Sequence, residues 1–308
     1  MRNVGIGCVA IVLAIAAGLH AQAPAAAKPV TKPAARPATT SAARRAGVAA
    51  RLAALASDIT SGRVTVVDLT QLLSAATPII QLPPPFANTP GFTSHEISAY
   101  NDKGPAWYWS WIEVGEHVGT HFDAPCHWVT GKDKACVDQI EAKQFIGPAA
   151  VIDVTADVAK NADFIAGRDT ILAWEKKHGR VPKGAWVILR TGWGARANDA
   201  KQFLNAGADG APHYPGFGKD SAEFLAGERD ILGVGVEQVG TDAAVGATAN
   251  PPFPNHSIMH GAGHFGLTQL ANVDKLPESG AIVIATPLKI QRGSGSPVRV
   301  IAIVPAAR

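Results

Sequence analysis

Several features are missing from this sequence of 308 residues, and each absence narrows the class of protein. The net charge is only +3, and no basic stripe with interleaved aromatic residues is present, which argues against nucleic acid as a partner. The apolar run at residues 4–18 is too short to span a bilayer comfortably, so we expect no stable membrane anchor. Internal repeats are absent as well. The chain as a whole is 47% hydrophobic, which is ample for a sizeable core.

The N-terminal region has the composition of a targeting segment. Residues 1–23 resemble a secretory signal peptide, with Arg2 before the apolar run and Ala21-Gln22-Ala23 as a cleavage site. Residues 24–47 are rich in Ala and Pro, which predicts a disordered linker. We therefore expect an exported protein, periplasmic or secreted, whose single folded domain occupies residues 48–308.

Cysteine is scarce, with only three residues in the chain. Cys8 falls in the signal peptide, which leaves Cys126 and Cys136. Export permits a disulfide between them. We nevertheless favour the interpretation of Cys126 as a small buried apolar residue.

Three histidines and one aspartate lie within eleven residues in the middle of the chain. They are His117, His121, Asp123 and His127, and all four occupy odd positions. Side chains alternate along an extended strand, so this parity places them on one face. Imidazole nitrogens and carboxylate oxygens are ligands of divalent metals. The cluster therefore predicts a metal site.

The backbone around this cluster must bend. Gly119 and Pro125 argue against a helix, because glycine is unfavourable inside a helix and proline breaks it. A straight strand would separate His117 from Asp123 by about 20 Å, whereas zinc ligands lie about 2 Å from the metal. We predict a bent strand that curls at Gly119 around the ion.

Aromatic residues precede the metal cluster. Trp107, Trp109 and Trp111 alternate along a predicted strand, and we expect most of that face to be core. A proline-rich loop at residues 78–90 carries Phe86 and is expected over a cleft. Trp107 and Phe86 are candidates for contacts with an aromatic small-molecule substrate, and capping of the core is the alternative for Phe86.

The remaining pattern mixes strands and helices irregularly, which predicts an α/β domain with a partly antiparallel sheet. We expect helices at 48–60, 165–179 and 221–227, a surface loop at 196–219, and strands at 64–69, 149–154, 186–193, 230–236, 281–285 and 298–304. A second histidine cluster contains His256, His260 and His264. Gly261 and Gly263 are expected to break any helix there, so we interpret His260 and His264 as substrate-side or structural residues.

The string His-x-Gly-Thr-His-x-Asp-x-Pro-x-His at residues 117–127 resembles the signature of the metal-dependent cyclase family, which includes kynurenine formamidase and isatin hydrolase. Further similarities run from residue 64 to residue 305, at 67–70, 151–154, 186–193, 240–242 and 272–277. The resemblance implies a swivelling β/β/α-type fold with a mixed sheet, and a homodimer. It also implies that His117, His121 and Asp123 bind zinc or manganese, that His127 is the acid/base, and that His256 binds a second metal or substrate.

The sequence departs from one branch of that family at the residue twelve positions after His256. Kynurenine formamidases have a glutamate there, whereas this chain has Thr268 followed by Gln269. Loss of a bridging carboxylate disfavours a two-metal centre. Gln269 is a candidate fourth ligand, as a glutamine is in isatin hydrolase, and Thr268 is a candidate for substrate contact.

The ligand chemistry by itself indicates hydrolysis. Two neutral imidazoles and one carboxylate leave the ion a net positive charge and open positions, so that it acidifies water, and His127 can then transfer the proton. We therefore predict hydrolysis of an N-formyl aryl amide or a cyclic amide such as isatin. The alternatives are a dehydratase, cyclase or lactone hydrolase at the same site, or an exported module that binds metal without catalysis.

Overall fold

The computed structural model describes residues 41–306 except 83, 85 and 209. The predicted signal peptide and residues 24–40 of the predicted linker lie outside this range. The chain divides into two units, residues 1–50 and residues 51–308. Helix α1, Ser41–Thr60, begins seven residues earlier than predicted. Its added first turns are rich in alanine, the residue with the highest helix propensity.

The second unit is built on a nine-stranded mixed sheet in the order β1-β13-β11-β5-β7-β9-β10-β4-β12. Its central strands run parallel: β5 (Ile146–Asp153), β7 (Ala185–Arg190), β9 (Ile231–Gly235) and β10 (Phe265–Thr268). Antiparallel strands flank them: β1 (Val64–Asp68), β13 (Val300–Pro305), β11 (Ser279–Ala285), β4 (His121–Asp123) and β12 (Gly295–Pro297). The predicted α/β class with a partly antiparallel sheet is confirmed.

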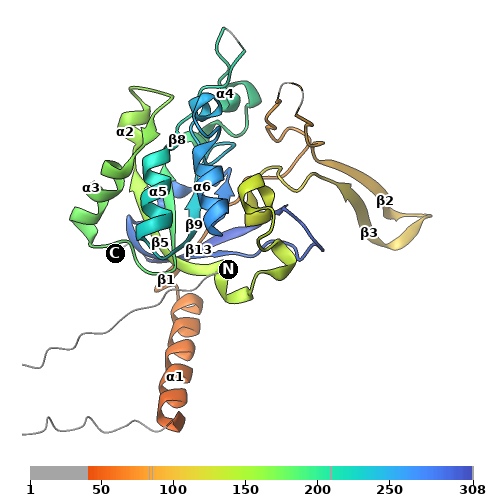
Figure 1. Ribbon diagram of the computed structural model, residues 1–308. Helices are drawn as coiled ribbons and strands as arrows, with labels where there is room; N and C mark the ends of the chain where they lie inside the picture. Colours follow the sequence, from red (N-terminus) through yellow and green to blue (C-terminus); the bar gives the residue numbers. More distant parts are fainter. Residues whose placement is uncertain (1–40, 83, 85, 209, 307–308) are drawn as a thin grey trace, which may run out of the picture. The chain divides into compact units, whose positions relative to one another are not determined.

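Each face of the sheet packs into its own core. Ala150 and Ile152 of β5 point towards the helices, whereas Ala149 and Val151 point to the opposite face. Figure 1 shows helices over one face of the sheet: α3 (Arg168–His178), α5 (Lys219–Glu228) and α6 (Pro254–Ala262). The sheet also curls, because residues from β1 and from β4, near opposite ends of the strand order, share the second core.

Short elements complete the unit. The predicted loop at 196–219 contains helix α4 (Ala200–Leu204) and strand β8 (Gly216–Phe217), which pairs with β6 (Ile165–Ala166). Helix α2 spans Thr155–Val158. The 3-10 helices are Pro125–His127, Val129–Gly131, Val137–Gln139, Ala142–Phe145, Trp193–Arg196, Ala244–Thr248 and Val273–Lys275. Among the described residues, no helix combines the length and the apolar character needed to cross a membrane.

A separate hairpin of β2 (Thr93–Asn101) and β3 (Gly104–Glu113) projects from this unit (Figure 1). The alternating strand that we predicted is present. The prediction that its tryptophans are core is wrong, because Trp107, Trp109 and Trp111 are 53%, 54% and 49% exposed. Within the described chain this hairpin pairs only with itself, so no second layer covers the rings.

Phe122 connects the second core to the metal cluster, since it lies between His121 and Asp123 on β4. Its ring is fully buried among Phe145, Trp186 and Phe265.

We expect Phe122→Ala to lower the free energy of unfolding by about 3–5 kcal/mol, measured by urea denaturation, because it leaves a cavity in this aromatic cluster. The matched control is Phe86→Ala, since Phe86 is 59% exposed and its loss should change stability by less than about 0.5 kcal/mol. Equal effects of the two substitutions would contradict this account of the core.

Candidate active site

The centre of the site is the short strand β4. Its outer neighbour is β12 and its inner neighbour is β10, both antiparallel to it. The chain enters β4 through a turn at Gly119, whose φ of +65° favours glycine. The predicted bend at Gly119 is therefore confirmed. The predicted alternation holds only for His121 and Asp123, because His117 precedes the turn and His127 lies in the 3-10 helix that follows.

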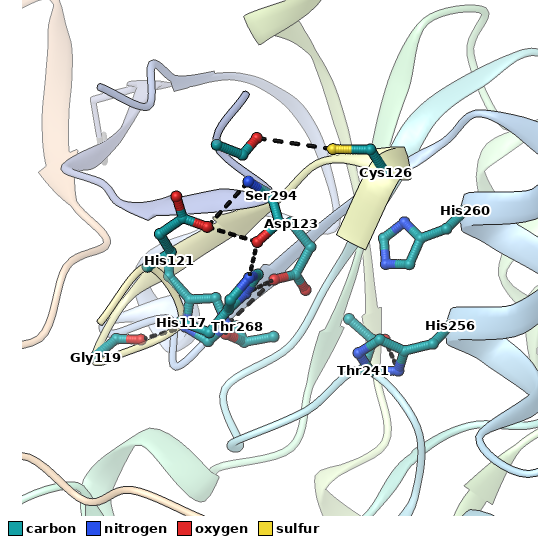
Figure 2. Close-up of polar contacts among 12 residues, drawn as sticks. His117, Gly119, His121, Asp123, Cys126, Thr241, His256, His260, Thr268 and Ser294 are labelled. Carbon is teal, nitrogen blue, oxygen red and sulfur yellow. Dashed lines mark hydrogen bonds and ion pairs between the residues drawn. The ribbon is translucent and has the colours of Figure 1, made fainter. Parts of the chain in front are cut away.

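Three predicted ligands converge at the Asp123 carboxylate (Figure 2). His117 Nδ1 lies 2.8 Å, and His121 Nε2 lies 3.3 Å, from Asp123 Oδ1. His121 Nδ1 lies 2.8 Å from the carbonyl oxygen of Gly119 and donates to it, which leaves the Nε2 lone pair towards the carboxylate. The turn at Gly119 therefore positions the backbone and also orients the His121 ring.

The donor set fits a divalent cation. Asp123 is 1% exposed, and its Oδ2 atom has no hydrogen-bond partner among the described residues. A buried carboxylate oxygen without a donor is costly unless a cation satisfies it. The Oε1 atom of Gln269 is also buried without a partner within the described chain. Gln269 follows Thr268, which pairs with His121 in the sheet, and its Nε2 donates to the carbonyl oxygen of Pro78 at 3.4 Å.

The charge state of Asp123 suits this role. Burial by itself opposes the charged carboxylate, but the adjacent rings of His121 and His117 hold the pKa of Asp123 well below its usual range. Asp123 is therefore a carboxylate at neutral pH. An anion in a buried position attracts a metal more strongly than the same group in water.

A second side of the site comes from α6. Two groups of possible ligands share Asp123. Ligand atoms of Asp123, His256 and His260 lie within 4.8 Å of one another. Ligand atoms of His117, Asp123 and His127 do so as well. The His127 ring stacks on His117 with 3.9 Å between ring centroids. The structure thus joins the two histidine clusters of the sequence around one carboxylate.

Helix α6 contradicts our prediction that glycines prevent a helix here. Gly261 lies inside the helix, and Gly263, with φ +94°, is its C-cap. The first turn compensates, because Asp242 accepts the backbone N–H groups of Asn255 and His256. The resulting helical spacing places His256 and His260 on one face. His264 lies beyond the helix and only its carbonyl oxygen, which His260 Nδ1 contacts, connects it to the cluster.

Sequence reasoning missed Asp242 as a functional residue. Its Oδ2 atom lies 2.5 Å from His256 Nδ1, and Thr241 Oγ1 lies 3.2 Å from the same nitrogen. Burial favours the neutral imidazole, but the Asp242 carboxylate outweighs burial and raises the pKa of His256. The signal in the sequence was the similarity of Gly240-Thr241-Asp242 to the cyclase family.

The pKa values of the neighbouring histidines shift in the opposite direction. Burial, together with the adjacent His117 ring, holds the pKa of His127 well below its usual range. Burial likewise lowers the pKa of His260 to about 4. Both rings are therefore neutral at pH 7, and a neutral His127 can accept a proton.

The segment after His127 is closed by a disulfide between Cys126 and Cys136. Our interpretation of Cys126 as an unpaired apolar residue was wrong. The segment folds back so that Cys126 N–H donates to Ala135 O. The bridge therefore fixes the two ends of the segment 126–136, which contains His127.

Three further candidates have distinct surroundings. The hydroxyl of Thr268 lies 2.9 Å from Nδ1 and 3.1 Å from Nε2 of His121, so it contacts a ligand ring directly. Trp107 lies on the projecting hairpin, and Phe86 lies exposed in the proline-rich loop. The structure does not bring either ring into the histidine cluster, and their substrate contacts stay predictions.

The fold and the site together define a class: a mixed α/β domain in which a bent strand gathers histidines and a buried carboxylate suited to a divalent cation, beside a neutral histidine base. Comparisons with known proteins agree with this class. Residues 67–243 match the family model described as "Putative cyclase". The chain is 48% identical to an isatin hydrolase of Roseibium aggregatum over 83% of its own length and 98% of that protein.

Other relatives extend the comparison. The chain is 27% identical to a kynurenine formamidase of Bacillus thuringiensis, over 70% of its own length and 90% of that protein. A crystal structure of an isatin hydrolase bound to the product analogue thioisatinate superposes with a TM-score of 0.81 at 47% identity, covering 83% of this chain and 98% of that one. The chain belongs to the cyclase family. It is a metal-dependent hydrolase that acts on amide C–N bonds outside peptides.

We expect His127→Ala to retain metal while hydrolysis falls by about 10²–10⁴-fold, because the substitution removes the proton acceptor and leaves His117, His121 and Asp123 in place. Metal content by atomic spectrometry and turnover would be measured on the same sample. The control is His178→Ala, since His178 contacts Glu278 outside the cluster. Loss of metal from the His127 variant would instead make His127 a ligand.

Proposed function

We propose that this chain hydrolyses the cyclic aryl amide of isatin, opening the five-membered ring to isatinate. The observation that carries the proposal is the replacement of a carboxylate by Thr268, whose hydroxyl contacts His121, next to Gln269 with its unsatisfied buried amide oxygen. This donor set supports a single ion bound by three charged or imidazole ligands and a neutral amide. The 48% identity to an isatin hydrolase supports the same substrate.

The proposed ion is zinc or manganese, held by His117, His121 and Asp123 with Gln269 as a further ligand. When bound, such an ion polarises the amide carbonyl and acidifies water. Both imidazole nitrogens and carboxylate oxygens suit these metals, and the set by itself does not discriminate between them.

The protein's own groups then move the protons. A ring nitrogen of His127 accepts a proton from the attacking water, whose oxygen bonds to the carbonyl carbon, and returns that proton to the ring nitrogen of the substrate as the C–N bond breaks. Asp242 accepts from Nδ1 of His256 and favours the protonated ring, and in that form Nε2–H donates to the carbonyl oxygen as negative charge develops there. Neutral His127 and protonated His256 thus have complementary roles.

A panel of substrates tests the proposal. We expect the kcat/KM for isatin to exceed that for N-formylkynurenine and for simple lactones by about 100-fold, since discrimination of that order follows from one well-fitted pocket. Removal of metal by a chelator should abolish turnover, and either manganese or zinc should restore it. Faster hydrolysis of N-formylkynurenine would identify an arylformamidase, and turnover of lactones alone would remove the amide from the proposal.

We propose that the protein is exported and works in the periplasm or outside the cell. The Cys126–Cys136 disulfide supports this, because disulfides persist in oxidising compartments. Fractionation of the source cells checks it, and recovery of the full-length protein in the cytoplasm would count against it.

We propose that the protein is a homodimer and that the hairpin of β2 and β3 contributes to the interface. Exposed Trp107, Trp109 and Trp111 support this, since contiguous exposed aromatic surface is typical of protein interfaces. Analytical ultracentrifugation should give about twice the mass of one chain. The triple substitution of these tryptophans by serine should shift the protein to the monomer, and an unchanged dimer would place the interface elsewhere.

A further inference from the structure

His117 is tied to a polar chain that neither the metal site nor the proposed reaction uses. Its Nε2 atom lies 2.9 Å from Ser294 Oγ (Figure 2). Ser294 Oγ lies 2.6 Å from Glu116 Oε2, and the backbone N–H of Ser294 donates to the same oxygen at 3.0 Å. Glu116, immediately before His117 in sequence, therefore reaches its neighbour's ring through a residue 178 positions away.

The direction of these hydrogen bonds follows from the chemistry of the groups. A carboxylate oxygen only accepts, so the Ser294 hydroxyl donates its hydrogen to Glu116. The lone pair of that hydroxyl then accepts from Nε2–H of His117. A neutral imidazole carries one proton, so Nδ1 of His117 is left with a lone pair.

That lone pair faces the Asp123 carboxylate, with Nδ1 2.8 Å from Oδ1. Two acceptors at this separation repel each other unless a cation lies beside both. The chain from Glu116 therefore prepares His117 to bind metal through Nδ1. His121 is prepared to bind metal through Nε2 instead, because its Nδ1 donates to the carbonyl oxygen of Gly119.

The backbone holds Ser294 in place independently of its hydroxyl. Ser294 O accepts from Ala124 N–H at 2.9 Å, and Gly293 O accepts from Val137 N–H at 3.0 Å. Gly295, the residue after Ser294, leaves room for the imidazole of His117. A Cβ atom at this position would lie 2.5 Å from Cε1 of His117. Removal of the hydroxyl should therefore leave the segment where it is.

We propose that Glu116 and Ser294 are positioning residues that fix the tautomer and orientation of His117 for metal binding. The proposal rests on the metal site of the proposed function and adds two residues that determine its affinity. Partners that hold the second nitrogen of a ligating histidine change metal affinity by about 10–100-fold when they are removed. Catalytic contact with substrate is not part of their role.

The test measures metal binding without substrate, by competition of the folded protein with a fluorescent chelator for Mn²⁺ and Zn²⁺. We expect Ser294→Ala and Glu116→Leu each to weaken binding by about 10–100-fold, because leucine is close to glutamate in size but offers no acceptor. The double variant should be little weaker than either single one, because both substitutions interrupt one chain. Ser294→Thr, which retains a hydroxyl, should stay close to the wild type.

Ser296→Ala is the matched control. Ser296 lies two residues after Ser294, within β12, and its hydroxyl contacts Leu288 N–H and Pro297 O instead of a ligand. We expect this variant to bind metal as the wild type does. The absorption spectrum of the Co²⁺-substituted protein should change for Ser294→Ala and stay unchanged for Ser296→Ala. Only the former substitution removes the hydrogen-bond partner of the ligand His117.

The outcomes separate the two proposals. If the wild type binds metal and the folded Ser294→Ala and Glu116→Leu variants bind it within threefold, the positioning role is wrong and the metal site stands. If the wild type binds neither Mn²⁺ nor Zn²⁺, the metal site itself is wrong, and the positioning role with it. Glu116→Leu nearly keeps the size of a partly exposed side chain, so it reports on binding even if Ser294→Ala does not fold.

Discussion

The Asp123 carboxylate is the charge on which the rest of the site depends. It is buried, one of its oxygens has no partner among the described residues, and four histidines contribute ligand atoms near it. A lone buried anion would be costly, so the surrounding structure must supply positive charge. His117 and His121 face it directly, and a divalent cation completes the balance. Hydrolysis is a consequence of this concentration of charge, because an ion with open positions can activate water.

Anchoring of that carboxylate relies on apolar packing. Phe122 faces the aromatic cluster in the second core, so alternation along β4 turns His121 and Asp123 to the other side. Strand β4 contains only three residues, yet it pairs on both edges, with β10 and with β12. A short strand held on both sides leaves little freedom to its side chains. Precise ligand placement thus follows from sheet pairing as much as from the ligands themselves.

The environments of His127 and His256 shift the pKa values of the two rings in opposite directions. Burial favours the neutral form of His127, whereas Asp242 favours the protonated form of His256, although the two rings are only 6.0 Å apart between centroids. Environments that separate the pKa values of neighbouring groups are how one site performs both base and acid steps at a single pH. The disulfide beside His127 and the hydrogen bonds of Asp242 to the first turn of α6 hold these rings in their places.

The sequence by itself determined the α/β class, the bend at Gly119, and the metal-binding character of residues 117–127, because these follow from local side-chain alternation, backbone freedom and ligand chemistry. It placed the strands of the central sheet closely for the same reason. Tertiary structure decided the rest. Helix α6 forms despite Gly261 because Asp242 caps its first turn, the tryptophans of β3 are exposed because no element covers the hairpin, and Ser294 reaches His117 only because β12 pairs with β4. Contacts between residues far apart in the chain depend on strand order, which no local pattern specifies.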